Sequence, residues 1–237
     1  MTRRRWIADQ VSGNRAVLIG EHADHLVRVL RARVGQEFDV AAGGVVRRAH
    51  VVALEGSRVE FELGDEIPLL AAPSLTLVLA VFKFDRMEWA IEKCTELGVA
   101  RIVPVITQRT DAHLASASAK RADRWRRIAL QAAEQSRRTA PPEIAAPVKF
   151  SDAVGLAAGL RIVLSESEQQ TQLRELSESQ PSEGGILLAV GPEGGWTAEE
   201  LQQFRQTGWI STSLGNTILR AETAAIAAVA ILISGLR

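Results

Sequence analysis

The sequence predicts an α/β protein in which a parallel sheet covered by helices follows a small β-rich domain. Residues 1–70 contain short runs rich in Val, Ile and Phe that are separated by Gly-containing turns. From residue 74 onward, apolar runs alternate with amphipathic stretches, which is typical of a parallel sheet with helices on both faces. A hydrophobic content of 46% is enough for a sizeable core and excludes a wholly disordered or fibrous chain.

The first domain, residues 1–70, is predicted to contain five strands and one helix. The helix covers residues 21–31, where apolar side chains recur on one side. The close spacing of the strands favours a small barrel. Residues 65–73, which carry two prolines, are predicted to form a linker. The strands are expected at residues 5–7, 16–19, 37–40, 45–52 and 58–63.

The second domain, residues 74–237, contains helices with recognisable ends. Asp85 is a good N-cap, with Glu88 three residues later, for a helix that stops at Gly98. A long helix over residues 118–138 has to end before the following pair of prolines.

A capping box at Thr197 and Glu200 opens another helix of this domain. The closing helix, residues 221–234, is apolar on nearly all sides and is therefore expected in a core or a subunit interface. Strands of this domain are expected at residues 75–82, 102–106, 162–164, 186–190 and 209–214.

The single cysteine, the length of the apolar stretches and the spacing of the histidines limit the cellular compartment of this protein and the ligands that it can bind. Cys94, the single cysteine, cannot form an internal disulfide and lies on the apolar face of its helix, which favours a packing role and a reducing cytoplasm. No secretory signal is visible, and the longest apolar stretch has ten residues, against roughly 20 for a membrane span. His22 and His25 lack a third ligand nearby, so no metal is expected.

The net charge of zero argues against a nucleic-acid partner, but the charges are segregated. Residues 1–58 hold ten arginines and six acids, residues 120–138 hold seven basic and two acidic residues, and residues 161–206 hold three arginines and eight acids. Arginine, whose planar fork suits phosphates and stacked bases, outnumbers lysine 24 to 4, although a GC-rich genome produces the same bias. The clustering makes both basic regions candidate nucleic-acid contacts.

Two loops follow predicted strands, at the sheet edge where ligands of parallel sheets bind. The first is Gly-Pro-Glu-Gly-Gly at residues 191–195, which lacks the lysine of a phosphate loop and the spacing of a dinucleotide loop. The second, residues 214–220, ends in Arg220 at the start of the closing helix, where a positive charge opposes the helix dipole. Arg220 therefore has either a functional task or a local ion pair with Glu222.

The long helix carries Arg124 and Arg127 on one face and ends in Glu-Gln-Ser-Arg-Arg at residues 134–138. A basic helix face is often simply solvated, so this pattern alone does not establish a site. G-x-S-x-G and H-E-x-x-H are absent, which excludes those hydrolase and zinc-protease motifs.

Four segments, residues 83–98, 134–138, 191–195 and 214–224, occur in this order along the chain. Together they resemble the RsmE-type ribosomal RNA methyltransferases of the SPOUT superfamily. The N-terminal region around Val-Leu-Arg at residues 29–31 is similar to that family's first module, so the resemblance covers essentially the whole chain.

The resemblance implies a SPOUT domain whose C-terminal segment forms a trefoil knot, preceded by a PUA-like RNA-binding domain. It also implies a cytoplasmic homodimer that uses S-adenosylmethionine to methylate N3 of one uridine in small-subunit (16S) ribosomal RNA. Arg137 and Thr217 depart from the family pattern, which often has a small and a basic residue there.

Site residues follow from the resemblance and from the basic clusters. The resemblance assigns the cofactor to Gly191, Gly194, Gly195, Leu214, Gly215, Ile218 and Leu219. It places Arg220, Glu222, Gln135 and Arg138 at the methyl-transfer site. The expected RNA contacts are Arg3, Arg4, Arg5, Arg28, Arg31, Arg124 and Arg127.

Methyl transfer to uridine N3 requires loss of its proton, and an arginine near O2 or O4 would stabilise the resulting charge. Arg220 or Arg138 is expected in that role, and an ion pair with Arg220 would make Glu222 a weaker base. The alternatives are a SPOUT methyltransferase for another nucleotide or for ribose, and a non-catalytic RNA-binding or ribosome-assembly protein. A generic nucleotide-binding enzyme is disfavoured because no phosphate motif is present.

Overall fold

The computed structural model describes residues 5–68, 74–177 and 184–235. Contacts divide the chain into two compact units, each described by itself here. The first unit comprises residues 1–71 and 133–141, and the second comprises residues 72–132 and 142–237. The sequence did not indicate that residues 133–141 group with the first unit.

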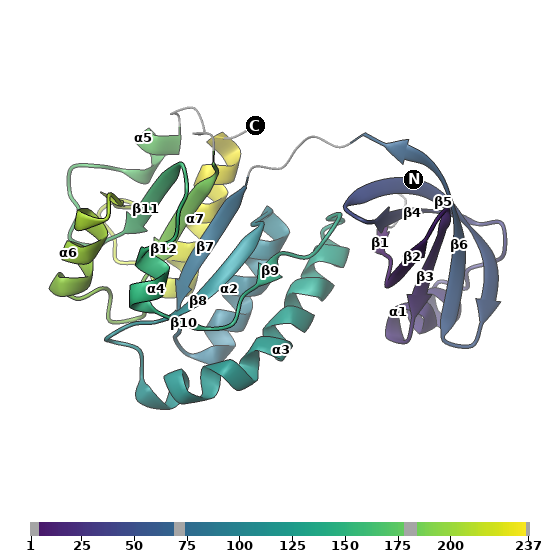
Figure 1. The fold of residues 1–237 in the computed structure, drawn as a ribbon, viewed down its shortest axis with the longest axis horizontal. Coiled ribbons are helices and arrows are strands. Elements are labelled where there is room, and N and C mark those ends of the chain that lie inside the picture. The colour runs from purple at the N-terminus through teal and green to yellow at the C-terminus, as the bar shows by residue number, and fades with distance from the viewer. Residues whose placement is uncertain (1–4, 69–73, 178–183, 236–237) are drawn as a thin grey trace. The chain divides into compact units, whose positions relative to one another are not determined.

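The first unit is built on a six-stranded sheet with the strand order β1-β4-β5-β6-β3-β2 (Figure 1). β1 pairs with β4 in parallel, and the other neighbouring strands pair antiparallel. Its core includes Phe38 and Phe61, whose rings meet edge to face at 6.1 Å. The strands are β1 (Arg5–Ile7), β2 (Gln10–Ser12), β3 (Arg15–Ile19), β4 (Glu37–Ala42), β5 (Val45–Glu55) and β6 (Arg58–Ile67).

Three local predictions for this unit need correction. The sheet has six strands rather than five, because β2 (Gln10–Ser12) was not predicted. The predicted helix begins where expected, as α1 (Glu21–Asp24), but continues as a π-helical turn, η1 (His25–Val29), that buries Leu26. β6 extends through Ile67, which pairs with Val46, so the start of the predicted linker is strand. The rest of that linker, residues 69–73, lies outside the described residues.

The second unit contains a parallel sheet with the order β10-β8-β7-β12-β11-β13, and β9 pairs beside β8. The apolar run at residues 186–190 forms a central strand with the predicted bounds and is buried along its whole length. The strands are β7 (Leu75–Ala80), β8 (Arg101–Ile106), β9 (Glu143–Ile144), β10 (Val148–Lys149), β11 (Leu160–Leu164), β12 (Ile186–Val190) and β13 (Ile210–Thr212).

Helices cover both faces of this sheet, as the alternating pattern predicted (Figure 1). One face packs against α2, α3, α5 and α7, and the other packs against α4, α6 and the indoles of Trp196 and Trp209. The ring of Phe204 contacts both indoles at 4.9 Å. The helices are α2 (Phe84–Leu97), α3 (Ala112–Gln135), α4 (Phe150–Val154), α5 (Leu173–Ser177), α6 (Ala198–Gln206) and α7 (Ala221–Gly235).

Several helix ends differ from the predictions. Lys83, rather than Asp85, is the N-cap of α2, and it makes no side-chain capping bond. α3 begins earlier than expected, because Asp111 Oδ1 accepts the His113 backbone N–H at 2.8 Å. Gly98 ends α2 in the left-handed conformation at φ 115°, as predicted. Among the helices of the described residues, none is long and apolar enough to cross a membrane.

Candidate active site

The loops that follow β8, β12 and β13 leave the sheet of the second unit at the edge formed by the strands' carboxyl ends. Parallel pairing of β8 with β7, β7 with β12, and β12 with β11 places these ends on one side. In open α/β sheets, ligands bind at this edge. Both loops singled out from the sequence therefore start at the edge where a site is expected.

The loop after β12 has glycine at three positions where a side chain would be crowded or strained. A side chain at Gly191 would place its Cβ 3.2 Å from the Trp196 ring, and one at Gly194 would place it 3.3 Å from Arg109 Cδ. Gly195 has φ +68° and donates its N–H to the Pro192 carbonyl at 2.8 Å. The glycines thus let the backbone turn sharply against neighbouring side chains.

The loop after β13 is tied to the segment that follows β11. The Ser213 N–H donates to the Thr171 carbonyl at 3.0 Å, and the Leu173 N–H donates to the Ser213 carbonyl at 2.9 Å. Gly215 adopts φ +118°, and nothing lies within 4 Å of where its Cβ would be. Ile218 is 80% exposed, which leaves an apolar side chain available to a ligand. Leu214 and Leu219 are half-buried.

Two predicted site residues at the start of α7 differ in how exposed their side chains are. Arg220 is exposed, and its backbone carbonyl accepts the Ala224 N–H at 2.8 Å; its side chain has no ion-pair partner among the described residues. Glu222 is 3% exposed and pairs with Arg86 of α2, with Oε1 3.8 Å from Nε. The local Arg220–Glu222 ion pair considered from the sequence is therefore not formed. Glu222 Oε2 is buried and has no hydrogen-bond partner among the described residues.

Arg86 was missed by the sequence analysis. It is 31% exposed and lies in the first turn of α2, which follows β7 after a short connection and packs against α7. Its position in the first helical turn after an apolar strand is the sequence feature that could have indicated a site residue. Arg86 thus lies 3.8 Å from the buried Glu222 carboxylate, which follows Arg220 by two residues in the chain.

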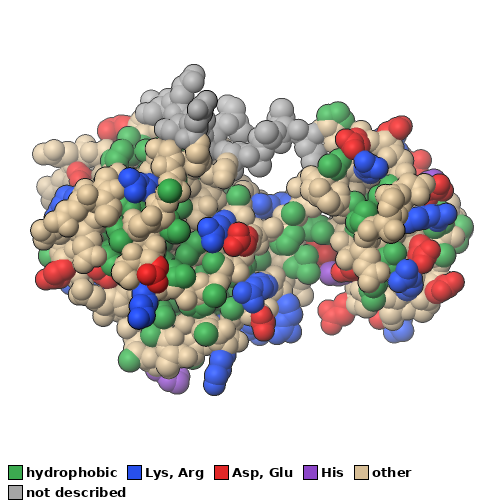
Figure 2. All heavy atoms as spheres, in the orientation of Figure 1, with side chains coloured by type: hydrophobic (Ala, Val, Ile, Leu, Met, Phe, Trp, Pro, Cys, Tyr) green, Lys and Arg blue, Asp and Glu red, His purple; other side chains and the backbone are tan. Residues whose placement is uncertain are grey.

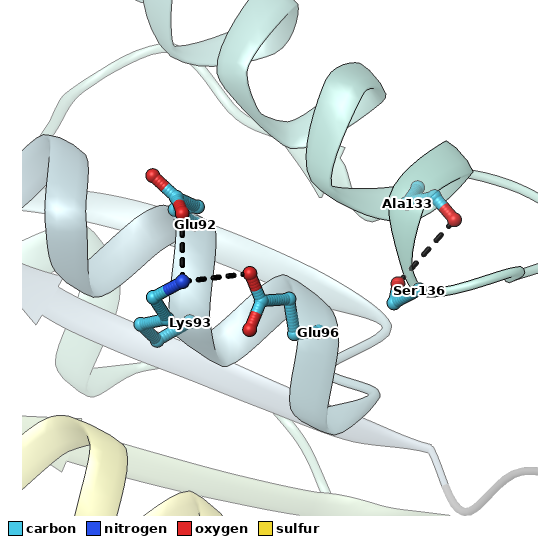
Figure 3. A network of polar contacts seen from close by, with 5 residues as sticks. All are labelled: Glu92, Lys93, Glu96, Ala133 and Ser136. Atoms are coloured by element: carbon cyan, nitrogen blue, oxygen red, sulfur yellow. Dashed lines mark hydrogen bonds and ion pairs between the residues drawn. The ribbon is translucent and has the colours of Figure 1, made fainter.

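Gln135 and Arg138, also predicted for the methyl-transfer site, belong to the first unit. Arg137 adopts φ +61°, and the Arg138 N–H donates to the Ala133 carbonyl at 2.8 Å, which closes the end of α3. Ser136 Oγ also donates to the Ala133 carbonyl, at 3.3 Å (Figure 3). Burial lowers the pKa of Arg138.

Residues of the β-rich domain hold this segment. The Arg5 guanidinium donates to the Arg137 carbonyl, and His22 Nε2 lies 3.0 Å from Glu134 Oε2. The hydrogen bond to Glu134 raises the pKa of His22. Burial lowers the pKa of Arg5, which Asp39 partly opposes. Arg5, expected to contact RNA, is thus engaged with the protein's own backbone.

The other predicted RNA contacts differ in how available their charges are. Arg124 forms a two-bonded ion pair with Glu88, at 2.7 and 2.9 Å, whereas exposed Arg127 has no ion-pair partner in the described part of the chain. Arg28 lies 3.6 Å from Asp24, and Arg31 is exposed at φ +51°. Arg3 and Arg4 lie outside the described residues.

Opposite charges are interspersed elsewhere on the second unit as well. On the face drawn in Figure 2, basic and acidic side chains alternate rather than forming one continuous basic surface. On α2, Lys93 Nζ lies between Glu92 and Glu96, at 2.7 and 2.8 Å (Figure 3). A count of charges along the sequence therefore overstates the free positive charge.

The described residues support neither a nucleophilic cysteine nor a metal site. Cys94 is fully buried, and burial raises the pKa of its thiol well above the usual value, which disfavours the nucleophilic thiolate. Across residues 5–68, 74–177 and 184–235, His, Cys, Asp and Glu form no group of three that could hold a metal ion. His22, one of the two histidines considered, bonds to Glu134.

Comparison with known proteins identifies the family. A model of the RNA methyltransferase domain matches residues 70–233. The ribosomal RNA small subunit methyltransferase E of Synechocystis sp. is 37% identical over 211 residues, covering 87% of this chain and 68% of that protein. The protein of the same name from Aquifex aeolicus is 30% identical over 235 residues, covering 96% of this chain and 97% of that protein.

Solved structures agree over the whole chain. The ribosomal RNA small subunit methyltransferase E of Neisseria gonorrhoeae, bound to S-adenosyl methionine, has a TM-score of 0.86 at 30% identity, covering 99% of this chain and 98% of that one. A putative methyltransferase of Legionella pneumophila in complex with SAM has a TM-score of 0.83 at 29% identity, covering 99% of this chain and 98% of that one. The chain belongs to the ribosomal RNA small subunit methyltransferase E family.

Proposed function

We propose that this protein transfers the methyl group of S-adenosylmethionine to N3 of one uridine in small-subunit (16S) ribosomal RNA. One arrangement carries the proposal: the glycine loop after β12 and the loop after β13 leave the same sheet edge, and the latter leads into Arg220, which is exposed. The family relationship supplies the cofactor and the RNA class.

The residues at this edge fit the proposed cofactor. Gly191, Gly194 and Gly195 would line its pocket with backbone, since a Cβ at Gly191 or Gly194 would crowd a neighbouring side chain and Gly195 has φ +68°. Gly215 presents open backbone, and Ile218 with half-buried Leu214 and Leu219 supplies apolar surface for an adenine ring. Once bound, the cofactor supplies an electrophilic methyl group on a sulfonium.

The protein's own side chains would prepare the uridine. N3 has to lose its proton before its lone pair can attack the methyl carbon, which leaves negative charge shared with O2 and O4. Exposed Arg220 can donate to one of these oxygens, as an oxyanion donor does. Buried Glu222, with Oε2 free of hydrogen bonds within the described structure, is the candidate acceptor of the proton, although its ion pair with Arg86 makes it a weaker base. Gln135 and Arg138 remain proposed residues of the methyl-transfer site, with Arg138 as the alternative to Arg220 for stabilising the charge.

N3 lies on the pairing edge of uridine, so the reactive base has to be unpaired or flipped out. Residues 1–70 are proposed to act as a PUA-like RNA-binding domain, and residues 74–237 as the SPOUT domain. Arg28, Arg31 and Arg127 are proposed phosphate contacts, with Arg3, Arg4, Arg5 and Arg124 as further members of the two basic clusters.

A trefoil knot in the second unit is also part of the proposal. The contacts of Ser213 with residues 171 and 173, and the Ser165 N–H bond to the Thr212 carbonyl at 2.9 Å, support a C-terminal segment lodged against the chain after β11. The apolar closing helix α7 supports a homodimer, since such a helix suits a buried interface. A cytoplasmic location follows from the proposed ribosomal RNA substrate.

The proposal is tested by a methylation assay on an Arg220 variant and by mass mapping of methylated nucleotides in ribosomal RNA. Arg220→Ala is expected to lower kcat for methylation by roughly 100-fold or more, the effect of removing one oxyanion donor. Full activity of this variant would refute the role of Arg220. Mass mapping of ribosomal RNA from cells lacking the protein should show one missing N3-methyluridine. Loss of a mark on another nucleotide or on ribose would refute the target, and no lost mark would favour a non-catalytic assembly protein.

A further inference from the structure

Two side chains from outside the glycine loop hold it in place. We propose that Arg109 and Glu200 are positioning residues that fix the Gly191–Gly195 loop for S-adenosylmethionine by tying it to the loop after β8. This inference rests on the proposed function, because it takes the glycine loop to be the cofactor loop. Neither residue attracted attention in the sequence beyond the helix cap at Thr197 and Glu200.

Glu200 does more than cap a helix. Its Oε2 accepts the Thr197 N–H at 2.9 Å, and the Glu200 N–H donates to Thr197 Oγ1 at 3.2 Å, which completes the capping box of α6. Its other oxygen, Oε1, accepts the Gln108 N–H at 2.9 Å. Glu200 is fully buried, so both of its oxygens are committed to backbone donors on two different loops.

Arg109 completes the connection from the adjacent residue. Its guanidinium donates to the Gly194 carbonyl, and its Cδ occupies the space beside Gly194 where a side chain would stand. Its Nη1 lies 4.0 Å from the Cβ position of Gly195. The arginine therefore lies along the backbone of two glycines, and a Cβ at Gly194 would crowd its stem.

The loop that carries Arg109 is itself anchored to the sheet. Thr110 Oγ1 accepts the Thr107 N–H at 3.1 Å and donates to the Val81 carbonyl at 3.2 Å. Trp196 anchors the other end of the glycine loop, with Nε1 donating to the Leu164 carbonyl at 2.9 Å. A continuous series of bonds thus joins the ends of β7, β8, β11 and β12.

Such a connection orders the loop before the cofactor arrives. A loop that is already ordered loses less conformational freedom on binding, so affinity is higher. Removing the connection should raise Kd and KM for S-adenosylmethionine and leave KM for RNA and kcat at saturating cofactor nearly unchanged. Loss of fold would instead lower the active fraction without changing either KM.

Glu200→Gln and Arg109→Met are the informative variants. Gln retains one acceptor but presents an amide N–H₂ to the second backbone donor, and Met retains the apolar stem of Arg109 without its donor. Each is expected to raise Kd for S-adenosylmethionine, measured by calorimetry, by about tenfold, the effect of losing one hydrogen bond to a charged group. Arg109→Lys, which keeps a donor, should recover part of the loss.

Thr197→Ala is the matched control. It removes the hydroxyl of the same capping box but leaves the Glu200 bond to Gln108, so it should lower thermal stability without changing Kd for S-adenosylmethionine. Because Arg109 is exposed, Arg109→Met is expected to fold even if Glu200→Gln does not.

The outcomes separate this inference from the proposed function. Gly195→Ala forces an alanine to φ +68° in the loop and should weaken cofactor binding. If Gly195→Ala weakens binding but Arg109→Met and Glu200→Gln do not, the positioning role is wrong and the cofactor loop stands. If none of these variants changes Kd while wild type binds S-adenosylmethionine, the cofactor lies elsewhere. An equal rise in Kd for Thr197→Ala would reduce the effect to helix stability and overturn the inference.

Discussion

The ion pair between Arg124 and Glu88 predicts that two arginines on one face of α3 contribute unequally to RNA binding. Arg124 gives both of its bonds to Glu88, at 2.7 and 2.9 Å, while Arg127 one turn later is exposed and unpaired among the residues described. A phosphate near Arg124 would have to displace this carboxylate and be repelled by it. Arg127 carries no such cost.

The magnitude follows from counterion release. Each lost phosphate contact reduces the slope of log Kobs against log salt by roughly 0.7 for single-stranded nucleic acid. Arg127→Ala should lose that increment, which is about 2.6-fold in affinity when salt rises fourfold. Arg124→Ala should change the slope by much less. Glu88→Gln should free Arg124, and also Arg121, whose Nη1 lies 3.5 Å from the same carboxylate, and should steepen the slope by roughly 0.7 for each arginine that gains a phosphate contact.

The assay is fluorescence anisotropy with a ribosomal RNA fragment at several salt concentrations, for wild type and the three variants. Arg124 and Arg127 are exposed, and exposed ion pairs contribute about 1 kcal/mol or less, so their variants are expected to fold. The Glu88 side chain is only 13% exposed, and Gln is chosen there because it keeps the volume of Glu. Equal slopes for Arg124→Ala and Arg127→Ala would show that the carboxylate does not withhold Arg124. An unchanged slope for Glu88→Gln would refute the reasoning from the other side.

Two further predictions concern titratable groups. The folded pKa of His22 is raised by Glu134, so the pair stabilises the fold below the unfolded value of about 6.5, and that contribution disappears as pH rises through the folded pKa. Urea unfolding between pH 5.5 and 8.5 should show this loss for wild type and not for His22→Gln, and identical pH profiles would contradict it. Cys94, whose pKa is raised by burial, should react with Ellman's reagent only after unfolding, and rapid labelling of the native protein would contradict the buried position.

Local patterns predicted the elements whose causes are local. The strand at residues 186–190 could be predicted because an apolar run bounded by glycines has few alternatives, and it has the predicted bounds. The end of α2 could be predicted because Gly98 has a conformation that other residues rarely adopt. The capping box at Thr197 and Glu200 has both reciprocal bonds.

The missed features depend on contacts between distant residues. Arg86 pairs with Glu222, and Gln108 bonds to Glu200, across separations that no periodicity reports. The beginning of the long helix was misplaced because Asp111 rather than a later residue caps it. The π-helical turn was missed because its apolar spacing resembles that of an α-helix over so few residues.

The grouping of residues 133–141 with the first unit has a consequence for truncated forms of the protein. A fragment that starts at residue 74 retains Glu134 and the Arg137 carbonyl but lacks His22 and Arg5, the groups that bind them. The carboxylate and the tight turn at φ +61° would then have to hold their places without those supports. Deleting the first seventy residues would thus disturb more than recognition of RNA, because the backbone that carries Arg138 would lose its scaffold.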